Sequence, residues 1–266
     1  MNHRPFFAHQ PPIMTGHRGG AGLWPENTLP SFRGAVQLGC RYLETDLHAT
    51  RDGVLVCLHD DSLDRTTNGR GLVWEQEWAA VEALDAGYWF APEDGYPWRG
   101  RGAGVPRLEE VLGELPGVFM TLELKQDGIE ELLVGAVDEL DAWDRVLVGS
   151  FHDERLRRVR RLSGGRVATS AGQREVFYVW AASRMGVALP SASDALQVPV
   201  RRGRIRLVDG RLVDAAHRSG KQVHVWTVNA PAEMHQLLDL GVDGLITDRP
   251  DILQRVLAER PLRSFP

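Results

Sequence analysis

Two residue types are scarce in this 266-residue sequence, and each scarcity is informative. Only Cys40 and Cys57 are cysteines, too few for a fold held together by disulfides, and they do not have the spacing of a metal-binding motif. Among 31 cationic residues only Lys125 and Lys221 are lysines, so the other 29 are arginines. In so arginine-rich a chain, a lysine is a candidate functional residue, because its ammonium group differs from a guanidinium in shape and in pKa.

Long apolar runs and excess positive charge are missing as well. No segment approaches the roughly 18 consecutive apolar residues of a transmembrane helix, and residues 1–14 lack the hydrophobic stretch of a signal peptide. We therefore expect a soluble, cytoplasmic protein without stable membrane insertion. The net charge of −5 argues against general electrostatic binding of nucleic acid.

The remaining composition is typical of one large globular domain, with 43% hydrophobic and 25% charged residues. Short apolar runs alternate with amphipathic segments, which predicts alternating strands and helices. The expected strands cover residues 13–17, 42–46, 118–125, 146–150, 167–170, 195–198, 223–228 and 244–247.

Eight strand–helix units in a chain of this length predict an α/β fold, a (β/α)8 TIM barrel that spans residues 1–266 as a single domain. A doubly wound parallel sheet is the alternative architecture. The helices expected between the strands include residues 128–140, 153–162, 208–219 and 231–240.

One segment, from residue 54 to about 116, interrupts the alternation. An extra apolar run, VLVCLH, precedes a stretch rich in Trp, Gly and Pro. We predict a hairpin and a small insertion, at about residues 60–116, between barrel strands two and three. The aromatic residues in it are predicted to form the insertion's own core, with a lid for an acyl chain as the alternative. They are Tyr88, Trp89, Phe90, Tyr96 and Trp98.

Carboxylates gather near the ends of two expected barrel strands. Glu44 and Asp46 lie two residues apart on one strand and so face the same side, as do Glu123 and Lys125 on the next. The carboxyl ends of barrel strands converge on one face. Three carboxylates without cysteine suit a hard cation, Mg²⁺ or Ca²⁺, and separate salt bridges are the plainer interpretation. Apolar flanking residues favour the metal, because buried charges need partners.

Two histidines are expected beside these carboxylates. His17 and Arg18 follow the first strand, and His59 follows the extra run VLVCL. A histidine pair can act as base and acid, and the guanidinium of arginine fits phosphate oxygens. Each histidine alone is more often structural, but this placement at strand ends favours catalysis.

Several nearby residues have plainer interpretations. Asn27 and Thr28 suit a helix N-cap, and Asp248 is predicted to be an N-cap as well. His48 shares the face of the carboxylates and is predicted to be their neighbour rather than a metal ligand. His224 is predicted to lie inside the barrel.

A series of short blocks runs through nearly the whole chain. In order they are HRGG at 17–20, PENT at 25–28, ETD at 44–46, VLVCLHDDSLDRTTNGRG at 54–71, LELK at 122–125, SF at 150–151, WTVN at 226–229 and GVDGLITDRP at 241–250. A chain with these blocks in this order resembles the glycerophosphodiester phosphodiesterase family. Each block is weak alone, but the ordered set is highly specific.

The resemblance implies a metal-dependent TIM-barrel hydrolase that cleaves small glycerophosphodiesters to glycerol 3-phosphate and an alcohol. The divalent cation would be Mg²⁺ or Ca²⁺, with Mn²⁺ as a further candidate, and the oligomeric state stays open. The implied roles are cation binding by Glu44, Asp46 and Glu123, acid–base catalysis by His17 and His59, phosphate binding by Arg18 and Lys125, and glycerol packing by Trp226.

A run of four arginines, at positions 201, 202, 204 and 206, follows the expected sixth strand. Its loop should therefore lie on the active face of the barrel. A solvated run is the plainer interpretation in so arginine-rich a chain. The alternative is a second anionic site for a phosphorylated or acidic headgroup.

Other activities remain as alternatives. A lysophospholipase D or a sphingomyelinase D-like phosphodiesterase would need an apolar acyl groove, which the sequence neither shows nor excludes. A metal-dependent barrel lyase with Lys125 as base would leave the two histidines unexplained. A non-catalytic glycerophosphate-binding protein is disfavoured by the complete acid–base and metal set.

Overall fold

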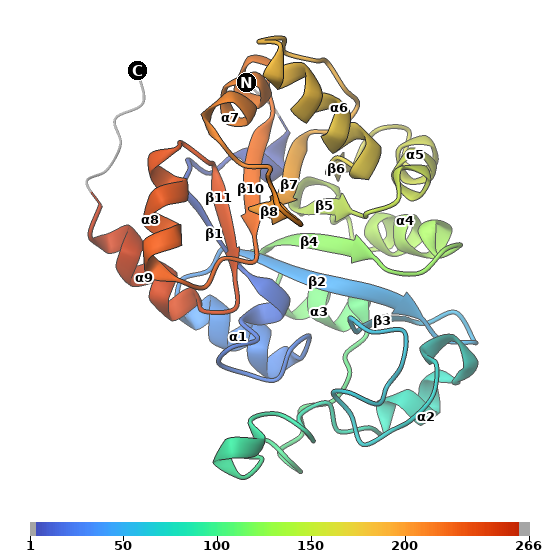
Figure 1. Ribbon diagram of the computed structural model, residues 1–266. Helices are drawn as coiled ribbons and strands as arrows, with labels where there is room; N and C mark the ends of the chain where they lie inside the picture. Colours follow the sequence, from blue (N-terminus) through green and yellow to red (C-terminus); the bar gives the residue numbers. More distant parts are fainter. Residues whose placement is uncertain (1–3, 261–266) are drawn as a thin grey trace.

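The computed structural model describes residues 4–260, and its centre is a barrel of parallel strands (Figure 1). The strands neighbour one another in the order β6-β5-β4-β2-β1-β11-β10-β7, and a parallel bridge between Ser170 and Ala195 joins the two ends. The predicted (β/α)8 barrel is thus confirmed. Its strands are β1 Ile13–Gly16, β2 Tyr42–Ala49, β4 Phe119–Leu124, β5 Val146–Gly149, β6 Ala168–Thr169, β7 Ala195–Pro199, β10 Gln222–Trp226 and β11 Gly244–Thr247.

Helices cover the outside of the barrel, as Figure 1 shows. Thr28 is the N-cap of the first helix, because its side chain accepts a hydrogen bond from the backbone N–H of Ser31. Of the two residues predicted to suit the cap, Asn27 and Thr28, Thr28 is the one that occupies it. Asp209 caps α7 in the same way, through the N–H of Leu212. The helices are α1 Leu29–Gln37, α3 Leu108–Glu114, α4 Glu130–Glu139, α5 Asp153–Leu162, α6 Gln173–Arg184, α7 Gly210–Arg218, α8 Pro231–Asp239 and α9 Pro250–Ala258.

The hydrophobic core fills the layer between strands and helices, so every residue of β2 is buried. Phe6 and Phe7 close the end of the barrel where the strands begin, and the hydroxyl of Tyr42 donates a 2.7 Å hydrogen bond to the carbonyl of Phe6. Both cysteine thiols are buried, and burial raises the pKa of each to about 12. No helix in residues 4–260 is both long and apolar enough to cross a membrane.

The segment after β2 forms a hairpin and then leaves the barrel. Strand β3, Leu55–Cys57, pairs antiparallel with the end of β2, and the short helix α2, Trp78–Glu82, follows it. The buried core of this insertion is aliphatic. It consists of Val56, Leu58, Leu63, Val73, Val81, Ala86 and Val105.

The predicted aromatic core of the insertion is wrong. Trp89 is 44% exposed, and the rings of Tyr88 and Tyr96 lie against the guanidinium of Arg99, at 4.0 and 3.9 Å from its central carbon. These rings pack around a cation at the surface, and aliphatic side chains fill the interior of the insertion instead. Neither these aromatics nor Arg99 line the cavity described below.

Candidate active site

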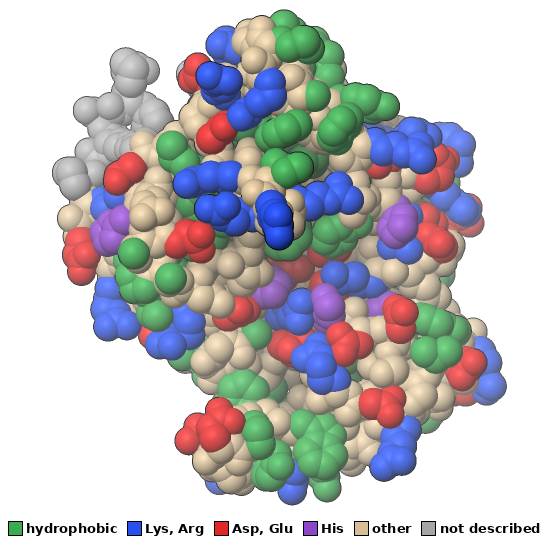
Figure 2. All heavy atoms as spheres, in the orientation of Figure 1, with side chains coloured by type: hydrophobic (Ala, Val, Ile, Leu, Met, Phe, Trp, Pro, Cys, Tyr) green, Lys and Arg blue, Asp and Glu red, His purple; other side chains and the backbone are tan. Residues whose placement is uncertain are grey.

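A cavity of about 510 Å³ opens at the carboxyl ends of the barrel strands. Figure 2 shows it as a hollow where acidic, basic and histidine side chains meet. Asp46, only 1% exposed, lies just beneath the lining at the floor of the cavity, beside Glu44 and Glu123. The other predicted site residues all line the cavity: His17, Arg18, Glu44, His59, Glu123, Lys125 and Trp226.

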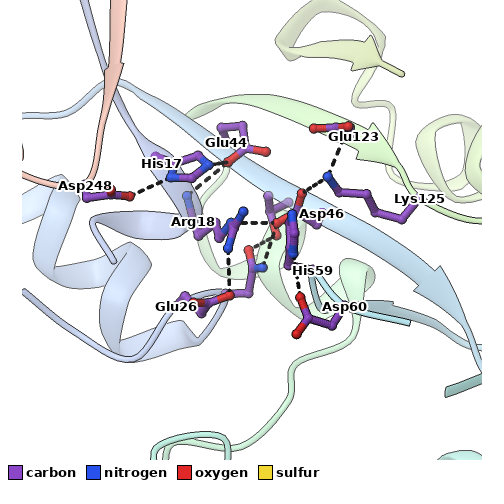
Figure 3. Close-up of polar contacts among 12 residues, drawn as sticks. His17, Arg18, Glu26, Glu44, Asp46, His59, Asp60, Glu123, Lys125 and Asp248 are labelled. Carbon is purple, nitrogen blue, oxygen red and sulfur yellow. Dashed lines mark hydrogen bonds and ion pairs between the residues drawn. The ribbon is translucent and has the colours of Figure 1, made fainter. Parts of the chain in front are cut away.

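Three carboxylates form the floor of this site (Figure 3). The pairing of β2 with β4 sets Asp46 directly beside Glu123, and Glu44 stands two residues before Asp46 on the same side. One oxygen from each carboxylate lies within 4.8 Å of the others. Burial and the neighbouring Asp46 carboxylate raise the pKa of Glu44 to about 7.

This cluster fits a hard divalent cation. Its donors are all carboxylate oxygens, and Asp46 Oδ1 and Glu123 Oε1 receive no hydrogen bond. Lys125 Nζ forms ion pairs with both, at 3.0 Å from the first oxygen and 3.1 Å from the second. Burial also raises the pKa of Glu123 despite the opposing effect of Lys125. A bound cation would strongly stabilise carboxylates that lie this close together and this far from water.

Asp46 is held by more partners than the sequence indicated. Asn27 Nδ2 donates a 3.0 Å hydrogen bond to its Oδ2, and the hydroxyl of Thr45 donates to Asn27 Oδ1 at 2.7 Å. Arg18 Nε lies 3.1 Å from the same Oδ2. Burial opposes ionisation, but Lys125 and Arg18 outweigh it and lower the pKa of Asp46. Asn27 therefore positions a carboxylate of the site, which its expected place at a helix cap did not predict.

The His17 ring is held by an aspartate from the far end of the chain. Asp248 Oδ1 lies 2.6 Å from His17 Nδ1, and Asn229 donates a 2.7 Å hydrogen bond to Asp248 Oδ2. Burial lowers the pKa of His17, but Glu44 and this hydrogen bond outweigh it and leave the pKa raised. The predicted N-cap role of Asp248 is wrong, because Arg249 occupies the N-cap of α9.

His59 has a matching arrangement at the end of the extra strand. Its Nδ1 lies 2.6 Å from Asp60 Oδ1. Arg65 donates hydrogen bonds to Asp60 and to Glu26, so it ties the hairpin to the loop after β1. Burial notwithstanding, Arg65 and His59 lower the pKa of Asp60 to about 2. In both histidines Nδ1 is engaged by a carboxylate, and Nε2 of His17 also lies 3.8 Å from Glu44 Oε2. That distance is too long for a hydrogen bond, so Nε2 can still take part in proton transfer.

The turn after β1 depends on glycine. Gly19 has φ of +82°, and a Cβ there would lie 2.3 Å from the hydroxyl oxygen of Ser31. This turn brings the backbone N–H of Arg18 to within 3.0 Å of Glu44 Oε2. The HRGG block thus places His17 and Arg18 while its own backbone contacts the acidic cluster.

An aromatic pair forms another part of the wall. Phe151 packs edge-on to Trp226, with ring centroids 5.6 Å apart, and Lys125 Nζ lies 5.7 Å from the Phe151 ring. Phe151 is 40% exposed and lines the cavity. The two rings offer an apolar surface beside the cations.

Among residues 4–260, the other histidines and Lys221 lie outside the cavity lining. His48 is buried, and its Nε2 lies 3.3 Å from the carbonyl of His59, so it supports the loop rather than the acidic cluster. His224 is buried inside the barrel, as predicted. The buried Lys221 donates hydrogen bonds to the carbonyls of Ser191 and Ser193, which gives this lysine a structural role.

Comparison with known proteins identifies the family. Residues 17–252 match the model of the Glycerophosphoryl diester phosphodiesterase family. The chain belongs to this family. Membership agrees with the resemblance predicted from the sequence blocks, and it makes the chain a phosphodiesterase.

Relatives from this family match over almost their full length. A Mycobacterium tuberculosis protein named "Probable glycerophosphodiester phosphodiesterase 2" is 36% identical over 261 residues, covering 96% of this chain and 94% of its own. A glycerophosphodiester phosphodiesterase of Caldanaerobacter subterraneus is 31% identical, covering 91% and 96%. An Oleispira antarctica phosphodiesterase, solved with the product sn-glycerol-3-phosphate, has a TM-score of 0.75 and 27% identity, covering 94% of this chain and 98% of that one.

Proposed function

We propose that this phosphodiesterase uses a divalent cation and two histidines to hydrolyse glycerophosphodiesters to glycerol 3-phosphate and an alcohol. The observation that carries the proposal is that one cavity brings together an acidic cluster, two oriented histidines and the positively charged side chains of Arg18 and Lys125. The product bound to the Oleispira antarctica phosphodiesterase supports the choice of substrate.

Charge neutralisation falls to Arg18 and Lys125. A phosphodiester is an anion, and the acidic floor alone would repel it. Both side chains line the cavity while contacting Asp46, so each presents positive charge above the carboxylates. They hold the non-bridging phosphate oxygens, and their contacts with Asp46 keep them in place before substrate arrives.

Glu44, Asp46 and Glu123 would hold the cation, which could be Mg²⁺, Ca²⁺ or Mn²⁺. When bound, it supplies Lewis-acid polarisation of the phosphoryl oxygens. Deprotonated carboxylates are needed for this, so Lys125 and Arg18 also help by keeping Asp46 ionised.

Proton transfer is assigned to His17 and His59. One takes a proton at Nε2 from the nucleophile, which is either water or the substrate's own glycerol hydroxyl, and the other delivers a proton from Nε2 to the departing alkoxide. Asp248 and Asp60 orient the two rings. Trp226 would pack against the glycerol moiety, alongside Phe151.

A turnover assay tests the proposal. EDTA-treated protein should be inactive on glycerophosphodiesters with several headgroups and should regain turnover when Mg²⁺, Ca²⁺ or Mn²⁺ is returned. His17→Ala and His59→Ala should each lower kcat by about 100-fold or more while cation affinity stays close to that of the parent. His152→Ala, at an exposed histidine outside the cavity lining, is the matched control.

Other results would point elsewhere. Near-normal turnover in both histidine variants would remove the acid–base assignment. Preference for a lysophospholipid over every glycerophosphodiester would favour the lysophospholipase D alternative, and binding of glycerol phosphate without turnover would favour a binding protein.

A further inference from the structure

A small β-hairpin stands at the rim of the cavity, next to barrel strand β7. Its strands are β8, Arg201–Arg202, and β9, Ile205–Arg206, which pair antiparallel across a turn where Gly203 has a φ of +59°. Pro199, at the end of β7, also lines the cavity. The short link from β7 therefore holds the hairpin at the mouth of the site.

The hairpin and the acidic floor share one continuous cavity. Arg201 and Arg202 line it together with His17 and Lys125. Figure 2 shows Lys and Arg side chains gathered over β8 along the edge of the hollow. Side chains between the two ends complete the wall: Gln173, Val176, Gln197 and Leu207.

The two arginines at the rim have no partner for their charge in the described part of the chain. Within residues 4–260, neither Arg201 nor Arg202 forms an ion pair or a side-chain hydrogen bond. Arg18 and Lys125, by contrast, already contact carboxylates of the floor. Each free guanidinium presents a planar set of N–H donors that suits a phosphate or carboxylate.

The chemistry of glycerophosphodiesters indicates which part of the substrate would carry an anionic group for these arginines. In a glycerophosphodiester the glycerol moiety carries only uncharged hydroxyls, so a second negative charge must belong to the alcohol portion. We propose that Arg201 and Arg202 form a subsite for an anionic group, a second phosphate or a carboxylate, on that alcohol. This inference rests on the proposed function and adds a preferred substrate class to it.

The test compares two substrates that differ by one phosphate, glycerophosphoinositol and glycerophosphoinositol 4-phosphate. The parent enzyme should have a higher kcat/KM for the phosphorylated substrate, by about tenfold or more, and high salt should reduce the preference. The double variant Arg201→Gln/Arg202→Gln should remove most of this preference. Arg204→Gln, in the same hairpin but outside the cavity lining, is the matched control and should keep it.

Each outcome separates this inference from the proposed function. Equal kcat/KM values for the two substrates in the parent, or equal losses on both in the double variant, would overturn the subsite while leaving the phosphodiesterase proposal intact. Calorimetric binding of glycerophosphoinositol 4-phosphate to EDTA-treated protein gives a readout independent of turnover. The double variant should bind it about tenfold more weakly than Arg204→Gln does, and equal affinities would again overturn the subsite.

Discussion

At the scale of single residues, the two histidines of the site are oriented by carboxylates that lie outside the cavity lining. Asp248 and Asp60 each approach the Nδ1 of a histidine at 2.6 Å. Each contact holds the imidazole ring in one orientation through Nδ1. Their effect should appear in the pH dependence of turnover as well as in its rate.

Asp248→Asn tests this positioning role. The carboxylate raises the pKa of His17, so its removal should move the pH–rate limb that belongs to this histidine to lower pH. We expect kcat to fall by about 10- to 100-fold with a smaller change in KM, because the ring loses its orientation. Asp251→Asn, which affects an ion pair with Arg249 instead, should change neither quantity. An unshifted pH profile in Asp248→Asn would contradict the role.

The acidic floor predicts a pH dependence for cation binding. Glu44 has a pKa raised to about 7 by burial and by Asp46, so below that pH a proton occupies a ligand position. The affinity for Ca²⁺ should therefore fall as the pH drops from 8 to 6, by about tenfold for each pH unit below 7. Calorimetric titration at pH 8, 7 and 6 measures this, and proton release should accompany binding at pH 6. A constant affinity over this range would contradict the prediction.

At the scale of elements, strand ends decide which residues meet. The alternation of side chains on β2 and its register with β4 bring Glu44, Asp46 and Glu123 together, and the sequence pattern predicted this. The contacts of Asp248 and Asn27 were not predictable in the same way. Asp248 contacts a histidine 231 positions away, and Asn27 contacts a carboxylate on strand β2. No local sequence pattern indicates either contact.

The insertion shows the same limit. A short apolar run predicted the hairpin of β3 with β2. This was possible because the pairing of two strands that are adjacent in sequence depends on the local sequence. Which side chains fill the small core is decided by packing over more than forty residues, from Val56 to Val105, and composition favoured the aromatics wrongly. The sequence therefore predicted where the insertion lies but not which side chains fill its core.

Gly19→Ala tests the turn that follows β1. The new Cβ would overlap Ser31, and φ of +82° is strained for alanine, so we expect a loss of about 2–3 kcal/mol in the free energy of unfolding and a large loss of turnover. Gly113→Ala, on α3 with open space around it, is the control and should be neutral or slightly stabilising. Urea unfolding measures both. Equal stability in the two variants would contradict the structural requirement for glycine at position 19.

At the scale of the whole molecule, a buried histidine should make the barrel sensitive to acid. Burial lowers the pKa of His224 to about 4, so the folded protein keeps it neutral while the unfolded chain takes up a proton near pH 6.5. Stability is therefore fully present above pH 6.5 and declines as the pH falls toward 4, by up to about 3 kcal/mol from this group.

His224→Gln isolates that contribution, because glutamine keeps an N–H donor near the position of Nε2, which lies 3.0 Å from Gln222. Urea midpoints of the parent and the variant should converge as the pH falls from 7 to 4.5. His152→Gln, at an exposed position, should show no such convergence. Parallel pH curves for the parent and His224→Gln would contradict the assignment.

The contact between His17 and Asp248 also has a consequence for biosynthesis. Strand β1 lies between β2 and β11, so the first strand of the barrel gains one of its two neighbours only when the last barrel strand has been made. A nascent chain that has passed residue 123 already contains all three carboxylates of the floor, yet it has no partner for His17 Nδ1. Premature termination between residues 123 and 248 would thus yield fragments with all three carboxylates of the floor but without the partner that orients His17.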